Sequence, residues 1–255
     1  MVLYEKKDRI AYIILNRPDR LNAIDMETAL ELARIWADFR GDNSIWVGIL
    51  SGNGKSFCAG ADISALPLGQ KWTLSKSSLL YGENKIGPSN YQVWKPLIAA
   101  VHGNVLGAGF YLAAECDLRV ASEDARFGLP EPKVGIPTLF APFLRRFLTD
   151  GQALELLLVG DKLDAQRAYN LGLVNRLTSR EQLLTVAGDL AQRLCENGPL
   201  ALRAMKEVYQ RSRGMDYDSA LALIEHVFTP VMNSEDAVEG KAAFVEKRRP
   251  QWKAR

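Results

Sequence analysis

The residues best placed to do chemistry stand in one stretch, where an apolar strand at 98–101 leads into three glycines, Gly103, Gly107 and Gly109, and then into a short helix. Glycines between a strand and a helix let backbone N–H groups approach a ligand closely, and the N-terminus of the helix adds a positive potential. The stretch is therefore predicted to hold negative charge.

Two kinds of negative charge fit such a turn. A phosphate is the common one, but the glycines do not follow the GxxxxGK[ST] spacing, and no acidic ribose-binding residue follows at the usual place. A developing oxyanion on a carbonyl is the other, because two convergent backbone donors stabilise it without a charged side chain. In that case Glu131, at the end of the sequence GLPE, is the candidate for moving protons.

The elements that must position these residues predict an α/β body followed by a helical tail. Alternating and apolar runs predict the strands, and capping residues, glycines and prolines mark the helix ends. The expected strands are 4–7, 10–15, 45–51, 98–101, 117–121 and 173–177, and the expected helices are 26–40, a short one from 63, 91–95, 110–115, 151–159, 164–171, 180–197, 200–213, 217–232 and 234–248, with Pro199 and Pro230 as stops. We divide the chain into a core, residues 1–177, and a C-terminal helical region, residues 178–255.

The overall composition excludes several classes of protein. The 32 basic and 30 acidic residues give a formal net charge of +2, which does not favour binding to nucleic acid or to a membrane surface. The three cysteines, Cys58, Cys116 and Cys195, show no CxxC spacing, which argues against a disulfide framework and a structural zinc site, and no metal cluster is evident. No apolar run reaches the roughly 18 residues of a membrane span. A soluble, cytoplasmic protein is expected.

Several further motifs resemble one family in order and approximate spacing. In chain order they are RPDRLNAI, FCAGADI, the stretch 98–117, ARFGLPE, VGIP, DAQRAYNLGLVN and SEDAVEGKAAFVEKRRPQW. Together they resemble the crotonase superfamily, the enoyl-CoA hydratase/isomerase group. The resemblance implies a crotonase-like α/β spiral of β-β-α units with a C-terminal helical trimerisation region. It also implies an acyl-CoA substrate and a homotrimer or a homohexamer built as a dimer of trimers.

The resemblance also assigns residues to roles. It implies that the backbone N–H groups of Ala61 and Ala108 form an oxyanion hole for the thioester carbonyl. The implied coenzyme A contacts are Arg20, Leu21, Ala23, Ala61, Asp62, Ile63, Phe244 and Lys247, of which the last two would reach the nucleotide of a neighbouring subunit. No separate cofactor is expected, because coenzyme A arrives as part of the substrate. Asp62 has a second interpretation, as the cap of the short helix from residue 63.

One position departs from the family pattern. Many hydratases of this family carry two glutamates, and here the second is present as Glu131 whereas Tyr111 occupies the place of the first. A phenol, with a pKa near ~10, is a poor base at neutral pH, although it can donate a hydrogen bond or orient water. Glu131 alone could move a double bond, or it could hydrate one with help from Tyr111. A hydrolase or lyase, and an acyl-CoA binder without turnover, stay open as alternatives.

The expected wall of the acyl pocket is rich in aromatic residues. The sequence TLFAPF follows the VGIP motif at 138–143, and Trp72, Tyr81 and Phe110 lie nearby in the sequence. These residues suggest a shaped apolar pocket for a ring or a branched acyl group. Ordinary core packing is the alternative for each aromatic side chain. Residues 66–90 lack clean periodicity, which is typical of a lid or a specificity loop.

Overall fold

The computed structural model describes residues 1–65 and 85–255 of the chain. Its main sheet has six strands in the order β1-β2-β3-β4-β6-β9, and a smaller sheet has three in the order β5-β7-β8. The strands are β1 (Val2–Lys7), β2 (Ile10–Leu15), β3 (Val47–Gly52), β4 (Leu97–Val101), β5 (Asn104–Leu106), β6 (Leu118–Ser122), β7 (Arg126–Gly128), β8 (Leu163–Asp164) and β9 (Arg176–Thr178). β1 pairs antiparallel with β2, and the other neighbours in the main sheet are parallel.

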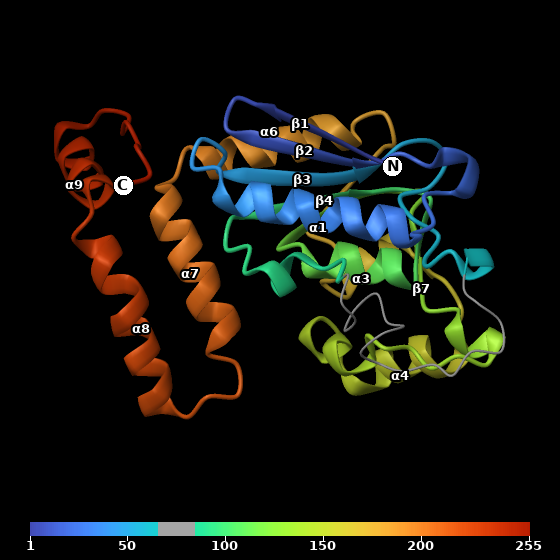
Figure 1. Ribbon diagram of the computed structural model, residues 1–255. Coiled ribbons are helices and arrows are strands. Elements are labelled where there is room, and N and C mark those ends of the chain that lie inside the picture. Colours follow the sequence, from blue (N-terminus) through green and yellow to red (C-terminus); the bar gives the residue numbers. More distant parts are fainter. Residues whose placement is uncertain (66–84) are drawn as a thin grey trace.

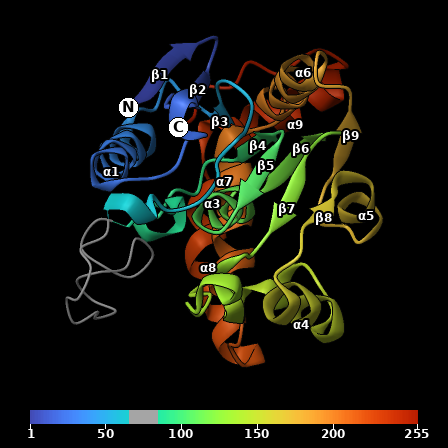
Figure 2. The same cartoon turned by 90° about the vertical axis from the view of Figure 1, so that its right-hand side faces the viewer.

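Helices cover both faces of the main sheet (Figures 1 and 2). Helix α1 (Met26–Gly41) begins at Asp25, whose carboxylate accepts a hydrogen bond from the Thr28 backbone N–H at 2.8 Å. Its buried side chains, Trp36 and Phe39 among them, join one hydrophobic core with one face of the strands. Helix α6 (Leu183–Cys195) buries small and apolar residues against the other face. A sheet covered on both sides explains the near-continuous apolar runs of its parallel strands.

The remaining helices lie around this sandwich. They are α3 (Ala108–Glu115), α4 (Asp150–Val159), α5 (Ala165–Asn170), α7 (Pro199–Arg211), α8 (Tyr217–Met232) and α9 (Glu235–Glu246). Figure 1 shows α7 leaving the body of the molecule and α8 returning beside it, so that the two form an arm, and α9 follows α8 at the level where α7 begins. Leu223 is the buried residue of α8, and most of its other side chains are exposed or half-buried. The prediction of a C-terminal trimerisation region falls on this arm and stays a prediction.

The α/β class and most of the predicted elements are confirmed, and several details differ. Residues 91–95 were expected to be helical, but the 3₁₀ turn η3 (Pro88–Tyr91) stops there because Gln92 is left-handed, with φ 53°. Strands β5, β7 and β8 were not predicted, since two or three residues are too few for periodicity to show. Pro230 was expected to end its helix, but it lies inside α8, which continues to Met232. The division after residue 177 stays a prediction.

Part of the sequence interpretation falls outside the described residues. The proposed lid or specificity loop falls largely on 66–84, which also carries Trp72 and Tyr81. Within 1–65 and 85–255, no helix is long and apolar enough to cross a membrane. In the same ranges no group of three or more His, Cys, Asp or Glu residues is arranged to hold a metal ion.

Candidate active site

Two glycine turns meet beside the start of α3. Cys58 pairs with strand β5, which leads to α3. The Cys58 N–H donates to Asn104 O at 3.0 Å, and the Leu106 N–H donates to Cys58 O at 3.0 Å. A Cβ on Gly60 would lie 3.3 Å from Leu106 O and 3.9 Å from the Ala108 nitrogen. Gly60 also has φ +114°, a conformation that side chains disfavour. A glycine at 60 therefore lets the two turns approach each other.

The backbone N–H groups of Ala61 and Ala108 are unused at this meeting point. Ala61 bridges Ile24, where the Ile24 N–H donates to Gly60 O at 2.8 Å and the Asp62 N–H donates to Ile24 O at 2.9 Å, which leaves the Ala61 N–H outside the ladder. Ala108 is the first residue of α3, so no carbonyl within the helix can accept its hydrogen. Neither group donates a hydrogen bond in the described part of the chain. Two idle donors at adjoining turns can bind an oxyanion.

The carboxyl group of Glu131 faces the same turn. Strand β7 pairs in parallel with β5, and the Gly107 N–H donates to Gly128 O at 3.0 Å, so the chain that follows β7 stays beside the start of α3. Glu131 opens the 3₁₀ turn η4 (Glu131–Val134). Its Oε1 would lie 3.0 Å from a Cβ on Gly107. Its Oε2 is buried and has no hydrogen-bond partner among the described residues. A buried carboxyl oxygen with no partner is available to a substrate.

Burial changes the acidity of this carboxyl group. Desolvation raises the pKa of Glu131 above its ordinary value, and this effect is offset in part by its own backbone N–H and by the nearby Thr138 hydroxyl. A carboxyl whose pKa moves toward neutrality can take up a proton and return it within one catalytic cycle. The site therefore contains one group suited to both halves of a proton transfer.

The raised pKa of Glu131 predicts a pH-dependent penalty on folding. Because the folded pKa exceeds the unfolded one, the folded state binds protons more tightly, so stability is lost as the pH rises from the ordinary carboxyl pKa through the raised value. We expect Glu131→Gln to be more stable than the wild type at pH 7, with the difference vanishing below about pH 4. Urea unfolding across this pH range measures it. A difference that does not change with pH would contradict the assignment.

Tyr111 lies on α3 and is 5% exposed. Its ring packs edge-on against Phe140, with 5.3 Å between centroids, and its hydroxyl accepts a hydrogen bond from Asn90 Nδ2 at 3.4 Å. A Cβ on Gly87 would come within 2.3 Å of the hydroxyl oxygen. The lack of a side chain at Gly87 thus leaves room for the hydroxyl, and Asn90 donates a hydrogen bond to it. No pattern in the sequence predicted these contacts, because the irregular segment that contains Gly87 and Asn90 has no periodicity.

The aromatic residues near this site divide between core and wall. Phe110 is fully buried, and its ring packs edge-on against Phe127 and Phe140 at 5.8 and 5.9 Å. Core packing, the alternative for Phe110, is therefore the better interpretation of that residue. Phe143 is only partly buried and stacks on Phe140 at 6.0 Å. The 138–143 segment thus carries aromatic rings that reach from the core to Tyr111.

The expected coenzyme A residues near the N-terminus gather beside the Gly60 turn. The segment containing Arg20, Leu21 and Ala23 is joined to it by the Ala59 N–H, which donates to Leu21 O at 3.0 Å. Arg20 and Leu21 are exposed.

Asp62 and Ile63 continue the same turn. The Asp62 carboxylate pairs with Arg17 at 3.2 Å and accepts a hydrogen bond from the Ser64 hydroxyl at 2.6 Å. Of the helix predicted from residue 63, the described residues include the 3₁₀ turn η2 (Ile63–Ala65), and the side chain of Ile63 is exposed. Asp62 therefore ties the turn to Arg17, and its role as a helix cap stays a prediction.

Phe244 and Lys247 are placed differently. Phe244 is 84% exposed on α9, and Lys247 ends that helix in the left-handed conformation, with φ 54°. Figure 1 shows α9 on the opposite side of the molecule from β7 and α4. The chain therefore does not bring these two residues to its own Glu131. Their contact with the nucleotide of a neighbouring subunit stays a prediction.

Comparisons with known proteins agree over nearly the whole chain. The family described as enoyl-CoA hydratase/isomerase matches residues 5–255. The mevalonyl-coenzyme A hydratase sidH of Aspergillus fumigatus is 36% identical over 252 residues, covering 96% of this chain and 91% of that protein. The short-chain-enoyl-CoA hydratase of Clostridium acetobutylicum is 35% identical, covering 97% and 95%. The crystal structure of an enoyl-CoA hydratase from Mycobacterium tuberculosis H37Rv superposes with a TM-score of 0.90 at 39% identity, covering 100% of this chain and 99% of that one.

Proposed function

The chain belongs to the crotonase superfamily, the enoyl-CoA hydratase/isomerase group, and on that premise we propose that it adds water to the double bond of an unsaturated acyl-CoA thioester with Glu131 as its acid/base. Relatives named as hydratases of mevalonyl-coenzyme A and of short-chain enoyl-CoA support a hydratase or lyase over other chemistries of the group. The acyl group we propose is branched or cyclic, in keeping with the aromatic wall at 138–143.

The proposed reaction begins at the thioester carbonyl. The N–H groups of Ala61 and Ala108 donate to its oxygen, and these bonds strengthen as negative charge develops there in the enolate. Glu131 removes a proton from water while the water oxygen bonds to the β-carbon of the acyl chain. The same carboxyl then gives a proton to the α-carbon, which restores the carbonyl and leaves Glu131 ionised. Tyr111 is proposed to orient the water through its hydroxyl.

One observation carries this proposal: a buried, unpartnered oxygen of Glu131 beside a turn with two idle N–H donors. Buried polar groups in proteins are nearly always paired, so three unpaired groups converging in one place favour a ligand that completes them. A thioester carbonyl and a water molecule supply the missing acceptor and donor. No cofactor beyond the substrate's own coenzyme A is needed for these steps.

Coenzyme A binding completes the proposal. The turn residues Arg20, Leu21, Ala23, Ala61, Asp62 and Ile63 would contact the nucleotide. Phe244 and Lys247 would reach the nucleotide of a neighbouring subunit in a homotrimer or a pair of trimers. The exposed position of Phe244 on the arm supports this assignment, because its side chain is free to contact another subunit.

The proposed reaction is tested by incubating the enzyme with a panel of linear, branched and cyclic enoyl-CoA thioesters and measuring product mass. A product heavier by one water supports hydration, and preference for branched or cyclic substrates supports the aromatic wall. An unchanged mass with altered absorbance would instead show isomerisation, and free coenzyme A would show hydrolysis. Binding of every thioester without turnover would reject the enzyme assignment.

Removing the Tyr111 hydroxyl tests its proposed role. We expect Tyr111→Phe to lower kcat by about 5-fold with little change in KM, because one hydrogen bond in the transition state is worth about 1 kcal/mol. Tyr91→Phe is the matched control, since the Tyr91 hydroxyl donates to Lys85 O at 2.8 Å within the adjoining segment. Steady-state kinetics of both variants decide the point. Equal rates for Tyr111→Phe and the wild type would reduce Tyr111 to a packing residue.

A further inference from the structure

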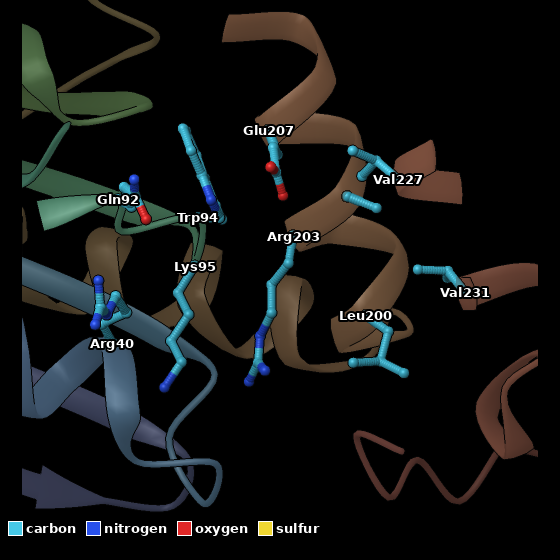
Figure 3. Close-up of a pocket in the computed structure, with 10 residues that line it drawn as sticks. Arg40, Gln92, Trp94, Lys95, Leu200, Arg203, Glu207, Val227 and Val231 are labelled. Carbon is cyan, nitrogen blue, oxygen red and sulfur yellow. The ribbon is translucent and has the colours of Figure 1, made fainter. Parts of the chain in front are cut away.

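A cavity lies between the body of the protein and the arm. It has a volume of about 300 Å³ (Figure 3). Leu200, Val227 and Val231 line its apolar side from α7 and α8, whereas the cationic side chains are Arg40, Lys95 and Arg203. Figure 1 places this arm at the far end of the molecule from β7 and α4, which flank Glu131 in the sequence. The cavity is therefore separate from the proposed active site.

Arg203 lines this cavity with part of its hydrogen-bonding capacity unused. Its Nε and Nη2 atoms are buried and have no hydrogen-bond partner in the described ranges. Glu207, one helical turn further along α7, pairs with Arg211, and Figure 3 shows its carboxylate lying away from the Arg203 guanidinium. Asp236 attracts Arg203 electrostatically, but its two carboxylate oxygens accept hydrogen bonds from the backbone of Lys253 and Ala254.

Lys95 places a second cation beside Arg203. It is 2% exposed, and its Nζ donates to the Phe39 and Asp42 carbonyl oxygens at 2.5 and 2.6 Å, at the C-terminus of α1. Burial and the charge of Arg203 lower the pKa of Lys95 to about 8. Figure 3 shows the two side chains extending in the same direction.

The charges around Lys95 come from more than one element. Asp42 and Asp38 on the α1 side favour its charged form, and Lys6 on β1 opposes it. Both aspartates are engaged by Lys6, at 2.8 and 2.5 Å. Their charge is therefore largely committed to Lys6 and does little to offset the repulsion between Lys95 and Arg203.

We propose that this cavity binds a small oxyanion, a phosphate or a carboxylate group, held by the Arg203 guanidinium with Lys95 beside it. A guanidinium offers two parallel N–H donors that match the paired oxygens of either group, and such charge-assisted bonds are the strong ones. The anion would satisfy both buried Arg203 nitrogens and relieve the repulsion between the two cations. The apolar side of the cavity leaves room for a short hydrocarbon substituent on the anion.

Calorimetric titration of the full-length protein tests the site, with sodium phosphate and sodium butanoate as separate probes at constant ionic strength. We expect saturable binding of at least one probe, and the comparison of the two distinguishes phosphate from carboxylate. Arg203→Met should weaken that binding by about 10-fold or more. Arg34→Met is the matched control, because it removes an exposed arginine of α1 that does not line the cavity, and it should bind like the wild type.

A conservative variant guards against a general loss of folding. Arg203→Lys keeps the positive charge but lacks the paired N–H donors of the guanidinium. This variant should therefore bind the anion more weakly than the wild type and more tightly than Arg203→Met. Circular dichroism confirms that each variant is folded before titration. Absence of saturable binding of both probes to the wild type would overturn the proposal. Equal affinity of the wild type and folded Arg203→Met would overturn it as well.

Discussion

Glu131→Gln is expected to lower kcat by about 10³-fold, within the range that general acid–base catalysis contributes. Glutamine has nearly the same shape as glutamate, so it can occupy the space beside Gly107, but its amide neither accepts a proton from water nor returns one to carbon. Because the buried Oε2 has no partner in the described chain, the substitution breaks no hydrogen bond of that atom. The measurement is the rate of hydration of the best thioester found in the panel.

Two controls separate a chemical loss from a structural one. Coenzyme A thioester affinity, measured by calorimetry, should stay within about three-fold of the wild type, since the nucleotide contacts lie elsewhere. Glu115→Gln changes another glutamate whose side chain is mostly buried, 6% exposed, at the opposite end of α3, and it should retain most of its activity. Wild-type turnover in folded Glu131→Gln would remove Glu131 from the mechanism.

The sequence predicted the parts of the fold that local physics determines. Asp25 was expected to cap α1, and its carboxylate accepts the Thr28 N–H. The glycine turns and Glu131 were found because a strand, a turn and a helix start have recognisable chemistry, and the structure places Gly60, Gly107 and Glu131 together. Helix caps and glycine turns, which depend on neighbouring residues along the chain, could therefore be predicted from the sequence.

Contacts between remote segments were not readable in the same way. Gly87 leaves room for the Tyr111 hydroxyl and Asn90 donates a hydrogen bond to it, although nothing in their own segment indicates that it packs on α3. A hydrogen bond from α1 holds that segment, because the indole N–H of Trp36 donates to Ile86 O at 2.8 Å. Such a contact depends on how α1 and α3 pack in three dimensions. The periodicity of the sequence does not predict that arrangement.

The charged residues show a similar limit. The composition established only that basic and acidic residues nearly balance, with a formal net charge of +2. The cavity beside α7 nevertheless brings Lys95 and Arg203 together from distant parts of the chain. Net charge describes the average field of a protein, whereas binding depends on which charges the fold leaves unpaired. The unpaired nitrogens of Arg203 became visible only with the side chains in place.

Unpaired groups in the proposed active site follow from the same principle. Most polar groups of this fold find hydrogen-bond partners. In the described residues, the exceptions at the proposed active site are the buried Glu131 Oε2 and the backbone N–H groups of Ala61 and Ala108. Such unpaired groups concentrate at functional sites because a ligand, not the chain itself, completes them. We expect Glu131→Gln to gain stability at pH 7 and to lose activity. Both effects have the same cause, because the buried carboxylate lowers the stability of the fold and is needed for the proposed reaction.

Ala108→Pro is expected to lower kcat by about 10²- to 10³-fold, the usual effect of removing one oxyanion-hole donor. A main-chain donor cannot be removed by changing a side chain, but proline lacks the N–H altogether. Proline is also favoured at the first position of a helix, which is where Ala108 stands, because the N–H lost there has no partner inside the helix. The substitution therefore removes the proposed donor while α3 keeps its hydrogen bonds.

Ala108→Ser is the matched control for this variant, since it adds a polar atom of modest size at the same position and keeps the N–H. It should retain activity within a few-fold of the wild type, while thermal unfolding shows whether Ala108→Pro is folded. Affinity for a substrate should fall less than kcat, because the bond to the thioester oxygen strengthens as the enolate forms. If folded Ala108→Pro turned over like Ala108→Ser, the Ala108 N–H would not stabilise the oxyanion, and the stabilising donors would have to lie elsewhere in the site.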